Sequence, residues 1–500
     1  MKKILLGWWW IAALLLGITS CSDEDDSVAV LPPVGEEEVL FTEQSDVTVV
    51  NTKDIVLGES EDDLVFEMTS TILTTSGSQV QTTLNCCAMG AAPLTTNPEN
   101  GMTKVDPDRE VTHVTLVNRG TITVHTRALV ERYKDLVNTL DDTTRPYVYL
   151  RLLVMYAGAN STVINEGKIN IYFDHDPSST STIYVMGMCG GDNSSLINNG
   201  EINFYGNGSI ATRLRGMATF GDEISCFNKG TMTADVEICE DSRLITTGGT
   251  RSNVINDGIM KMRVPGMALC MTRYKDTNLI NNNLVDLTLV DLPEGYTPVG
   301  NGVYPTICAL YEPLSGDRQQ MPSMVNRGTI NVRIEGTERT NPVSQAYGIF
   351  CDLMNNKGEQ LEVNIINDGN INLAQSGPVR CWMAEAGFIA KPAAAKAACN
   401  IKLGRWRTTL RDFSQTHDLF LARGAKMDFS GGEIMLARGE DYVDGTCYSV
   451  APEDLFYDAG NGTYRYEYTG YEGLAFSADD GENDVIQWDS ENRTAALDSK

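Results

Sequence analysis

The chain has few basic residues for its length and very few histidines. It carries 39 Lys and Arg against 67 Asp and Glu, a formal net charge of −28, and 4 His among 500 residues. A charge of this size and sign argues against nucleic acid as a partner and against direct attraction to anionic glycans or lipids. An acidic polymer could bind only through a bridging cation.

The motifs of common enzyme sites are also missing. The four histidines form no HExxH or other metal-ligand spacing, and no CxxC pair is present. There is no Gly-x-Ser-x-Gly elbow and no phosphate-binding loop. The sequence therefore gives no support for a zinc, serine-hydrolase or phosphate-transfer site.

The cysteines give little evidence of a disulfide framework. Apart from Cys21, eleven cysteines remain, an odd number without regular spacing. Four of them lie in apolar strings, where a buried free thiol packs as a small hydrophobic group: Cys189, Cys270, Cys308 and Cys351. We expect these cysteines to be core residues.

An apolar run lies at the N-terminus. Residues 1–20 combine Lys2 and Lys3 with a short apolar stretch, which is typical of a secretory signal. The segment LLLGITSC resembles a bacterial lipobox, and this resemblance implies that Cys21 carries the lipid. The alternative is an ordinary thiol behind a soluble signal. No later apolar run is long enough to cross a bilayer.

An acidic segment follows Cys21. Residues 22–45 hold eight acidic and no basic residues, so residues 21–45 should form a solvated tether. Cys-Ser followed by acidic residues resembles the export signal of surface lipoproteins of the Bacteroidetes. That resemblance implies an outer-membrane protein, anchored by lipid and exposed at the cell surface.

A short phrase recurs along the middle of the chain, as in LINNGEINFYG (residues 196–206). Its Asn is preceded by two apolar residues in all eight copies, and the second residue after it is Gly in seven and Asn283 in the eighth. Because Asn is the residue that best replaces Gly at positive φ, we predict a left-handed bend at this position. The eight asparagines are Asn118, Asn165, Asn198, Asn228, Asn256, Asn281, Asn326 and Asn367.

After the bend the sequence alternates. Positions four and six after each Asn are apolar in every copy, which predicts a half-buried strand. A strand after a fixed bend, repeated every 25 to 47 residues, indicates a solenoid. Stacked coils would align the asparagines into a buried hydrogen-bonded ladder. Ligand binding by these asparagines is the less favoured alternative, since their apolar neighbours imply that they point inward.

This repeat resembles those of right-handed parallel β-helices in adhesin-like surface proteins, over about residues 111–373. The resemblance implies an all-β, single-stranded, pectin-lyase-like β-solenoid with short helical and loop insertions. We expect a β segment or cap over residues 46–110, the β-helix over 111–436, and an acidic, Tyr-rich cap over 437–500.

Several segments interrupt the repeat. Residues 128–142 have the apolar spacing of an amphipathic helix, and KPAAAKAACN (391–400) is a second helix candidate. A long insertion, residues 291–323, carries Tyr296, Tyr304 and Tyr311 as candidate ligand contacts. In the tail, Tyr464, Tyr466 and Tyr468 fall on one face of a predicted strand. They would either cover the last coil or form an aromatic platform for sugars.

The β-helix fold also hosts enzymes that cleave pectin. The polygalacturonase-like strings Asn-Thr-Asp, Gly-His-Gly and Arg-Ile-Lys are absent, and the nearest local cluster to a lyase site is YFDHDP. Asp174 and Asp176 would lie on one side of an extended segment and could hold Ca²⁺, or they could belong to a solvated turn.

We therefore predict a non-catalytic surface lipoprotein that acts in adhesion or in binding a glycan or a host protein. The alternatives are a polysaccharide lyase or glycoside hydrolase of this fold, and a scaffold subunit of an envelope complex. Beyond possible Ca²⁺ no cofactor is expected, and the membrane would be reached through the lipid.

Overall fold

A computed structural model gives the structure of the chain. It describes residues 40–59, 65–74, 77–91, 94–96, 103–105, 111–139, 148–178, 183–209, 212–219, 221–272, 277–291, 293–295, 306–313, 323–335, 344–352 and 361–376, and beyond these the strands named below with residues 491 and 492. The chain divides into two compact units, Met1–Gly35 and Glu36–Lys500. All described residues belong to the second unit. Among them, no helix is long and apolar enough to cross a bilayer.

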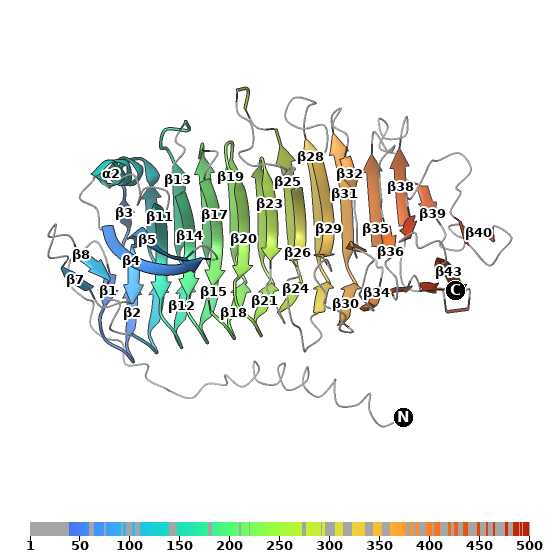
Figure 1. Cartoon of the computed structure of the whole chain (residues 1–500), viewed down its shortest axis with the longest axis horizontal. Coiled ribbons are helices and arrows are strands. Elements are labelled where there is room, and N and C mark those ends of the chain that lie inside the picture. The colour runs from blue at the N-terminus through green and yellow to red at the C-terminus, as the bar shows by residue number, and fades with distance from the viewer. Residues whose placement is uncertain are drawn as a thin grey trace. The chain divides into compact units, whose positions relative to one another are not determined.

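Three long sheets make up this unit, and the chain visits them in turn (Figure 1). Sheet A consists, in spatial order, of β1 (Leu40–Thr42), β6 (Met89–Ala91), β11 (Val148–Ala157), β14 (Ile183–Gly190), β17 (Thr212–Thr219), β20 (Asp241–Thr247), β23 (Met267–Thr272), β26 (Thr306–Pro313), β29 (Ser344–Asp352) and β32 (Cys381–Met383). Three further strands join it: β33 (Gly387–Ile389) on β29, and β5 (Gly77–Cys86) with its antiparallel partner β4 (Val65–Thr74) on β11.

Sheet B carries the asparagine phrases. Its order is β2 (Thr48–Asn51), β9 (Thr115–Asn118), β12 (Thr162–Asn165), β15 (Ser195–Asn198), β18 (Ser225–Asn228), β21 (Asn253–Asn256), β24 (Asn278–Asn281), β27 (Ser323–Asn326), β30 (Leu361–Asn367), β34 (Ala397–Lys402), β37 (Ala425–Asp428), β44 (Thr494–Ser499) and β43 (Asp484–Asp489). Pairing is parallel from β2 to β37 and antiparallel beyond.

Sheet C carries the alternating segments that follow each phrase. Its order is β3 (Ile55–Leu57), β10 (Thr121–His125), β13 (Lys168–Phe173), β16 (Glu201–Gly206), β19 (Thr231–Val236), β22 (Ile259–Val264), β25 (Leu284–Val290), β28 (Thr329–Glu335), β31 (Asn370–Ser376), β35 (Arg405–Leu410), β38 (Ile434–Arg438) and β39 (Tyr448–Val450). Its last pair, β38 with β39, is antiparallel. Three two-stranded sheets complete the described strands: β7 (Leu94–Thr96) with β8 (Thr103–Val105), β36 (Leu419–Leu421) with β42 (Phe476–Ala478), and β40 (Tyr457–Asp458) with β41 (Tyr464–Arg465).

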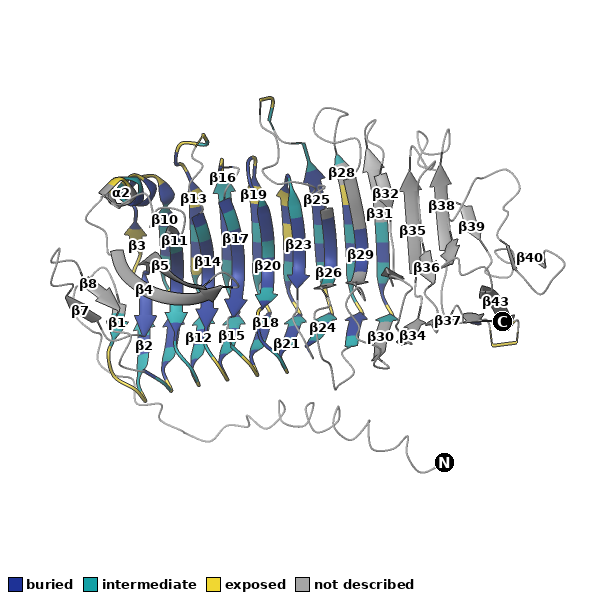
Figure 2. Ribbon diagram, viewed as in Figure 1, coloured by how far each residue is buried: buried dark blue, intermediate teal, exposed yellow. Residues whose placement is uncertain are grey.

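The fold is the predicted right-handed parallel β-helix, and its core lies between the three sheets (Figure 2). The apolar positions of the repeat fill it: Leu196, Ile202 and Phe204 are fully buried, as are their equivalents in neighbouring coils. Cys189, Cys270 and Cys308 are buried free cysteines, as expected, whereas the side chain of Cys351 lies outside the described residues. Stacking of equivalent side chains thus builds one continuous core.

A ladder of amides runs along sheet B. The Nδ2 of each repeat asparagine donates to the Oδ1 of the next, at 2.7–2.9 Å, from Asn118 through to Asn367. Asn51 of the faint first copy donates to Asn118 in the same way, at 2.8 Å. All of these side chains are buried, with at most 2% exposure. The asparagines therefore satisfy one another and are not available to a ligand.

The glycine of each phrase has a different role from the predicted one. None of these glycines has positive φ, and neither does Asn283. What excludes a side chain is the preceding coil: a Cβ on Gly200 would lie 2.0 Å from the carbonyl oxygen of Gly167, and the same contact recurs along the column. At Asn283, which has a Cβ, the bond from Leu284 N to Gly258 O is stretched to 3.4 Å, whereas the equivalent bond to Gly230 O is 2.9 Å. The prediction of a left-handed bend at this position was wrong.

Left-handed residues occur instead two positions before the strands of sheet B. They form a column at the corner between sheets A and B, with φ between 52° and 60°: Asp46, His113, Asn160, Asn193, Glu223 and Arg251. No residue type is common to the column, so no repeated letter marks this corner in the sequence. The bend from sheet A into sheet B is thus made, in these coils, by one residue with a left-handed backbone conformation.

The predicted helix is present, and the second helix candidate is partly wrong. α2 spans Thr126–Thr139 and buries Leu129 and Tyr133 against the core. In the second candidate, residues 397–400 belong to β34, which pairs with β30 and β37 on either side. Residues 391–396 lie outside the described part. Pairing within sheet B overrides the helix propensity of the alanines.

Candidate functional site

The predicted carboxylates Asp174 and Asp176 lie just after β13, and each has local partners. Asp174 accepts a hydrogen bond from the backbone N–H of Arg127 through Oδ1 (2.9 Å), and its Oδ2 lies 3.0 Å from Nδ1 of His125. It thereby caps the first turn of α2, where a negative charge is favourable. Asp176 is exposed and accepts bonds from the N–H and hydroxyl of Ser178, at 2.9 and 2.7 Å.

These contacts make the two carboxylates parts of a helix cap and a turn. In the described part of the chain, no three His, Cys, Asp or Glu side chains come together in a way that could hold a metal ion. The ring of His175, between the two aspartates, is buried and pairs through Nδ1 with the hydroxyl of Thr126 at 2.8 Å. The YFDHDP segment anchors α2 on sheet C.

The structure places few of the predicted tyrosines. Tyr311 lies on β26 and not on a loop, because residues 306–313 of the long insertion form a strand of sheet A. Its ring packs beside Leu269, Cys308 and Tyr347 on the outer face of that sheet. Tyr464 lies on β41, which pairs with β40, but its side chain is outside the described residues. Tyr296, Tyr304, Tyr466, Tyr468 and Cys21 lie outside them altogether.

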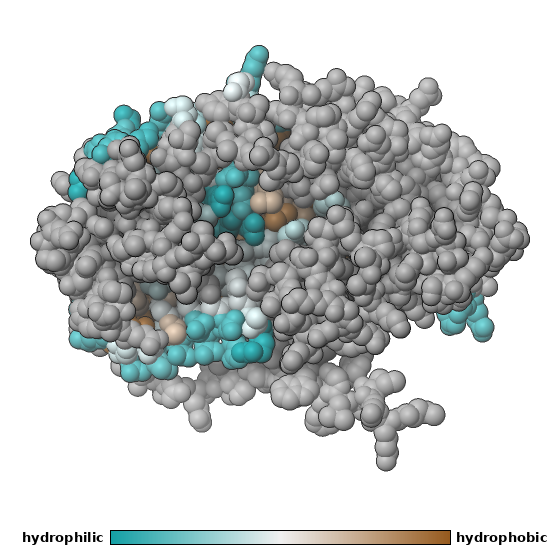
Figure 3. Space-filling view, in the orientation of Figure 1, coloured by the Kyte–Doolittle hydropathy of each residue, from teal (hydrophilic) through white to brown (hydrophobic). Residues whose placement is uncertain are grey.

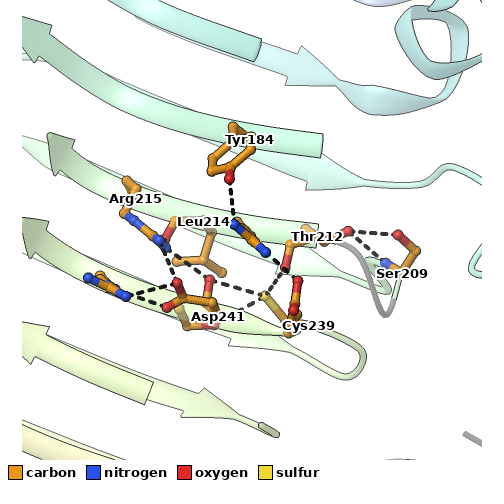
Figure 4. A network of polar contacts seen from close by, with 11 residues as sticks. Tyr184, Ser209, Thr212, Leu214, Arg215, Cys239 and Asp241 are labelled. Carbon is orange, nitrogen blue, oxygen red and sulfur yellow. Dashed lines mark hydrogen bonds and ion pairs between the residues drawn. The ribbon is translucent and has the colours of Figure 1, made fainter. Parts of the chain in front are cut away.

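A group of charged side chains that the sequence did not single out lies on the outer face of sheet A (Figure 4). Arg213 and Arg215 belong to β17, and Asp241 and Arg243 to the adjacent β20, with Glu240 directly before it. Register brings them together, since Arg213 pairs with Asp241 and Arg215 with Arg243. We call these five residues the arginine cluster.

Asp241 is held by two guanidinium groups. Arg215 donates from Nη2 to Oδ2 at 2.6 Å, and Arg243 donates from Nε and Nη2 to the two carboxylate oxygens at 3.0 and 3.1 Å. Burial alone would raise the pKa of Asp241, but the two arginines lower it below its ordinary value. Burial lowers the pKa of Arg215, opposed by the charge of Asp241. Arginine nevertheless keeps its charge in proteins, so this is a buried ionic triad.

Arg213 makes a second, more open pair. Its Nε donates to Oε2 of Glu240 at 3.1 Å, its Nη1 donates to the hydroxyl of Tyr184, and its guanidinium lies 5.2 Å from the centre of the Tyr184 ring. The side chains of Arg213 and Glu240 are 34% and 27% exposed, whereas those of Arg215 and Asp241 are 9% and 6% exposed. The cluster thus has a buried side and a side that reaches solvent.

Polar contacts inside the coil hold the start of both strands. The hydroxyl of Ser242 donates to Sγ of Cys239 at 3.2 Å, and that thiol donates to the carbonyl of Thr212 at 3.2 Å. Ser209 N donates to Oγ1 of Thr212 at 2.7 Å. The two bonds of the Cys239 thiol connect the start of β20 to the start of β17 beside the arginines.

Apolar groups border the arginine cluster on both sides. Leu153, Met186, Cys189 and Ala218, with Tyr156 and Tyr184, form one outer cluster, and Leu269, Cys308 and Tyr347, with Met267 and Tyr311, form the other. Figure 3 shows hydrophilic residues next to hydrophobic ones near the middle of the view. The outer face of sheet A therefore combines charged and apolar groups in one place.

An aromatic column lies on the outer face of sheet C. The rings of His125, Tyr172 and Tyr205 stack at 5.2 and 5.3 Å between centroids, in the register of β10, β13 and β16. The rings cover each other's faces, and Tyr172 is 37% exposed. Asp235 and Arg263, a loose pair at 3.8 Å, continue the column in the next coils. This column presents ring edges to solvent, which suits it less well to stacking on sugars.

Comparison with known proteins gives one similarity. Residues 22–229 match the sequence model of a family described as the BigA third pectate lyase-like domain. The match covers less than half of the chain, from the acidic segment through β18. No curated protein and no solved structure matches significantly. The similarity agrees with the parallel β-helix.

Proposed function

We propose that the chain is a surface lipoprotein that uses its β-helix as a rigid scaffold to present a binding face for a glycan or protein ligand, without catalysing a reaction. The buried amide ladder supports this proposal most directly, because it locks neighbouring coils together along the repeat. Such a scaffold suits presentation of a surface rather than movement. The similarity to the BigA domain agrees with this view.

The anchor is tested with the full chain in its own membrane. Cys21→Ala should move the protein from the membrane fraction to the soluble fraction, because the variant cannot carry a lipid on this cysteine. Cys21→Ser serves as a second variant without the thiol-linked lipid, and Cys226→Ala, which changes a buried cysteine, is the matched control. A Cys21→Ala protein that stays in the membrane fraction would contradict the anchor.

Surface exposure and binding are tested separately. Protease added to intact cells should remove the chain, and it should spare a periplasmic marker. A glycan array and a panel of envelope and host proteins then probe binding. Replacing Tyr464, Tyr466 and Tyr468 together by Ala tests the tail as a contact surface, and replacing Tyr296 and Tyr304 tests the insertion.

A second candidate, a polysaccharide lyase of this fold, is favoured by the pectate lyase-like description of the matching family. It predicts formation of unsaturated sugars from pectate in the presence of Ca²⁺, followed by ultraviolet absorbance. Asp174→Asn would abolish this activity if Asp174 bound the cation. If Asp174→Asn destabilised α2 and left the activity unchanged, Asp174 would act only as the cap of that helix.

A further inference from the structure

The arginine cluster has one more positive than negative charge. Arg213, Arg215 and Arg243 face Glu240 and Asp241, so three cations meet two anions. The whole chain, by contrast, carries 67 acidic and 39 basic residues. Within the described residues, the positive surplus of the arginine cluster thus differs in sign from the net charge of the chain, and it needs a separate physical explanation.

Stability does not explain the cluster well. Taking charges out of water is expensive, and well-packed apolar residues often replace a buried ion pair without loss of stability. The groups on either side, from Leu153 to Ala218 and from Met267 to Tyr347, show that this face can be apolar. Charges kept between two apolar clusters indicate a binding role.

The donors needed for an anion are present. Each guanidinium has five N–H groups, and the contacts described above use Nε and Nη1 of Arg213 and Nε and Nη2 of Arg243. Within the described part of the chain, Nη2 of Arg213 and Nη1 of Arg243 have no hydrogen-bond partner. The two side chains are diagonal neighbours on β17 and β20 and reach solvent, with 34% and 23% exposure.

We propose that Arg213 and Arg243 form a binding site for a carboxylate on the outer face of sheet A. This inference deepens the proposed function, on which it rests, by naming the chemistry of the ligand. Planar guanidinium groups match the two oxygens of a carboxylate. Tyr184 pairs with Arg213 and Met267 pairs with Asp241, so the ring of Tyr184 and the side chain of Met267 would cover the apolar part of the same ligand.

The net charge limits the ligand further. A chain of formal charge −28 repels a polyanion at long range, whereas a single carboxylate close to two arginines interacts mainly within one Debye length, about 8 Å at physiological salt. The ligand should therefore carry an isolated carboxylate. Sugar acids and the C-termini of peptides both provide one, and the test distinguishes them.

Glucuronate with glucose as its neutral partner, and acetylglycine with acetylglycinamide, are titrated calorimetrically into the purified full chain. Glucuronate binding alone identifies a sugar acid, acetylglycine binding alone identifies a peptide terminus, and binding of both identifies a general carboxylate site. In each case the neutral partner should bind at least about tenfold more weakly. Failure of both carboxylates to bind would overturn the proposal.

Variants with opposite expected effects separate binding from a structural role. Arg213→Gln and Arg243→Gln should weaken binding by about tenfold or more, since each removes a charge-assisted donor. Glu240→Gln should strengthen it, because it removes the anion that competes for Arg213. Arg263→Gln, on the outer face of sheet C, is the matched control and should change nothing.

Thermal unfolding of every variant checks that it folds. Should an arginine variant fail to fold, Glu240→Gln still decides the matter: unchanged or weaker carboxylate binding in that variant would overturn the site. Equal losses in Arg213→Gln and Arg263→Gln would also overturn it. None of these results affects the Cys21→Ala experiment, so failure of the site and failure of the anchor are distinguishable.

Discussion

Asn198 donates a hydrogen bond from Nδ2 to Oδ1 of Asn228 at 2.8 Å, and neither side chain is exposed to solvent. Asn165 donates to Asn198 from the preceding coil in the same geometry. The side chain of Asn198 therefore connects three coils, although it is one position away from the exposed Asn199.

Replacing Asn198 by Ala should lower the free energy of unfolding by about 1–3 kcal/mol, because a buried acceptor on Asn228 loses its donor. Asn199→Ala, one residue further on and exposed, is the control and should change stability by less than about 0.5 kcal/mol. Denaturant unfolding of both variants measures the difference. Equal effects would show that the ladder contributes nothing specific.

Gly200→Ala should destabilise the protein by at least about 3 kcal/mol, at the upper end of ordinary overpacking. The added Cβ would lie 2.0 Å from the backbone oxygen of Gly167, which cannot move without disturbing its own coil. Asn283→Ala is the matched variant at the same place in the repeat, where a Cβ is already accommodated. It should cost less than about 1 kcal/mol, and a cost as large as that of Gly200→Ala would contradict this explanation.

Asn193→Val should cost about 1–2 kcal/mol, because Asn193 has φ of 54° and a β-branched residue adopts this conformation poorly. Asn199→Val, also exposed but not in a left-handed conformation, should be nearly neutral. Asn193→Gly should be tolerated as well. The order of melting temperatures among the three variants checks the role of the corner.

His175 should make stability depend on pH. Its burial lowers its pKa from 6.5 to about 4, despite the nearby Asp174. Between these values the unfolded chain binds a proton that the folded chain does not, so stability is complete above pH 6.5 and falls as the pH falls, by up to about 1.4 kcal/mol per unit. Below pH 4 this contribution no longer changes.

His175→Asn should flatten that part of the curve, since an amide can still pair with Thr126 but does not titrate. Asn199→Ala, which changes an exposed side chain that does not titrate, is the control and should leave the slope unchanged. Chemical unfolding at a series of pH values measures both. An unchanged slope in His175→Asn would rule out this histidine as the source.

The fold could be predicted from the repeat because each recurring residue type occupies a position that contacts the equivalent position in the next coil. Apolar residues such as Ile202 and Phe204 alternate in the sequence since they alternate across a strand, and Asn198 recurs since it contacts its own copies. The corner residues, such as His113 and Arg251, share a conformation and no chemistry, so the sequence could not reveal them. The glycines were found, but a single sequence does not distinguish positive φ from close approach of another coil.

The arginine cluster was harder to foresee. Arg213-Leu-Arg215 and Glu240-Asp241-Ser-Arg243 each look like the exposed side of a strand, and members of the two segments lie 25 to 30 positions apart. Only the register of β17 with β20 brings Arg215 and Asp241 together. One signal was available in the sequence. Charged residues alternate with apolar ones in β17, whereas the equivalent outward positions of strands β14 and β23 hold residues such as Met186 and Met267.

The spacing of the phrases, from 25 to 47 residues, leaves the register of sheet B unchanged, because the extra residues lie outside the paired strands. Loops can therefore lengthen or shorten without displacing a coil, while a change in the number of coils requires the gain or loss of a complete repeat. Cutting residues 199–228 would join Asn198 directly to Lys229 and place Asn198 opposite Asn256. Loops on the surface can therefore change in evolution by single residues, whereas the length of the β-helix can change only by complete coils.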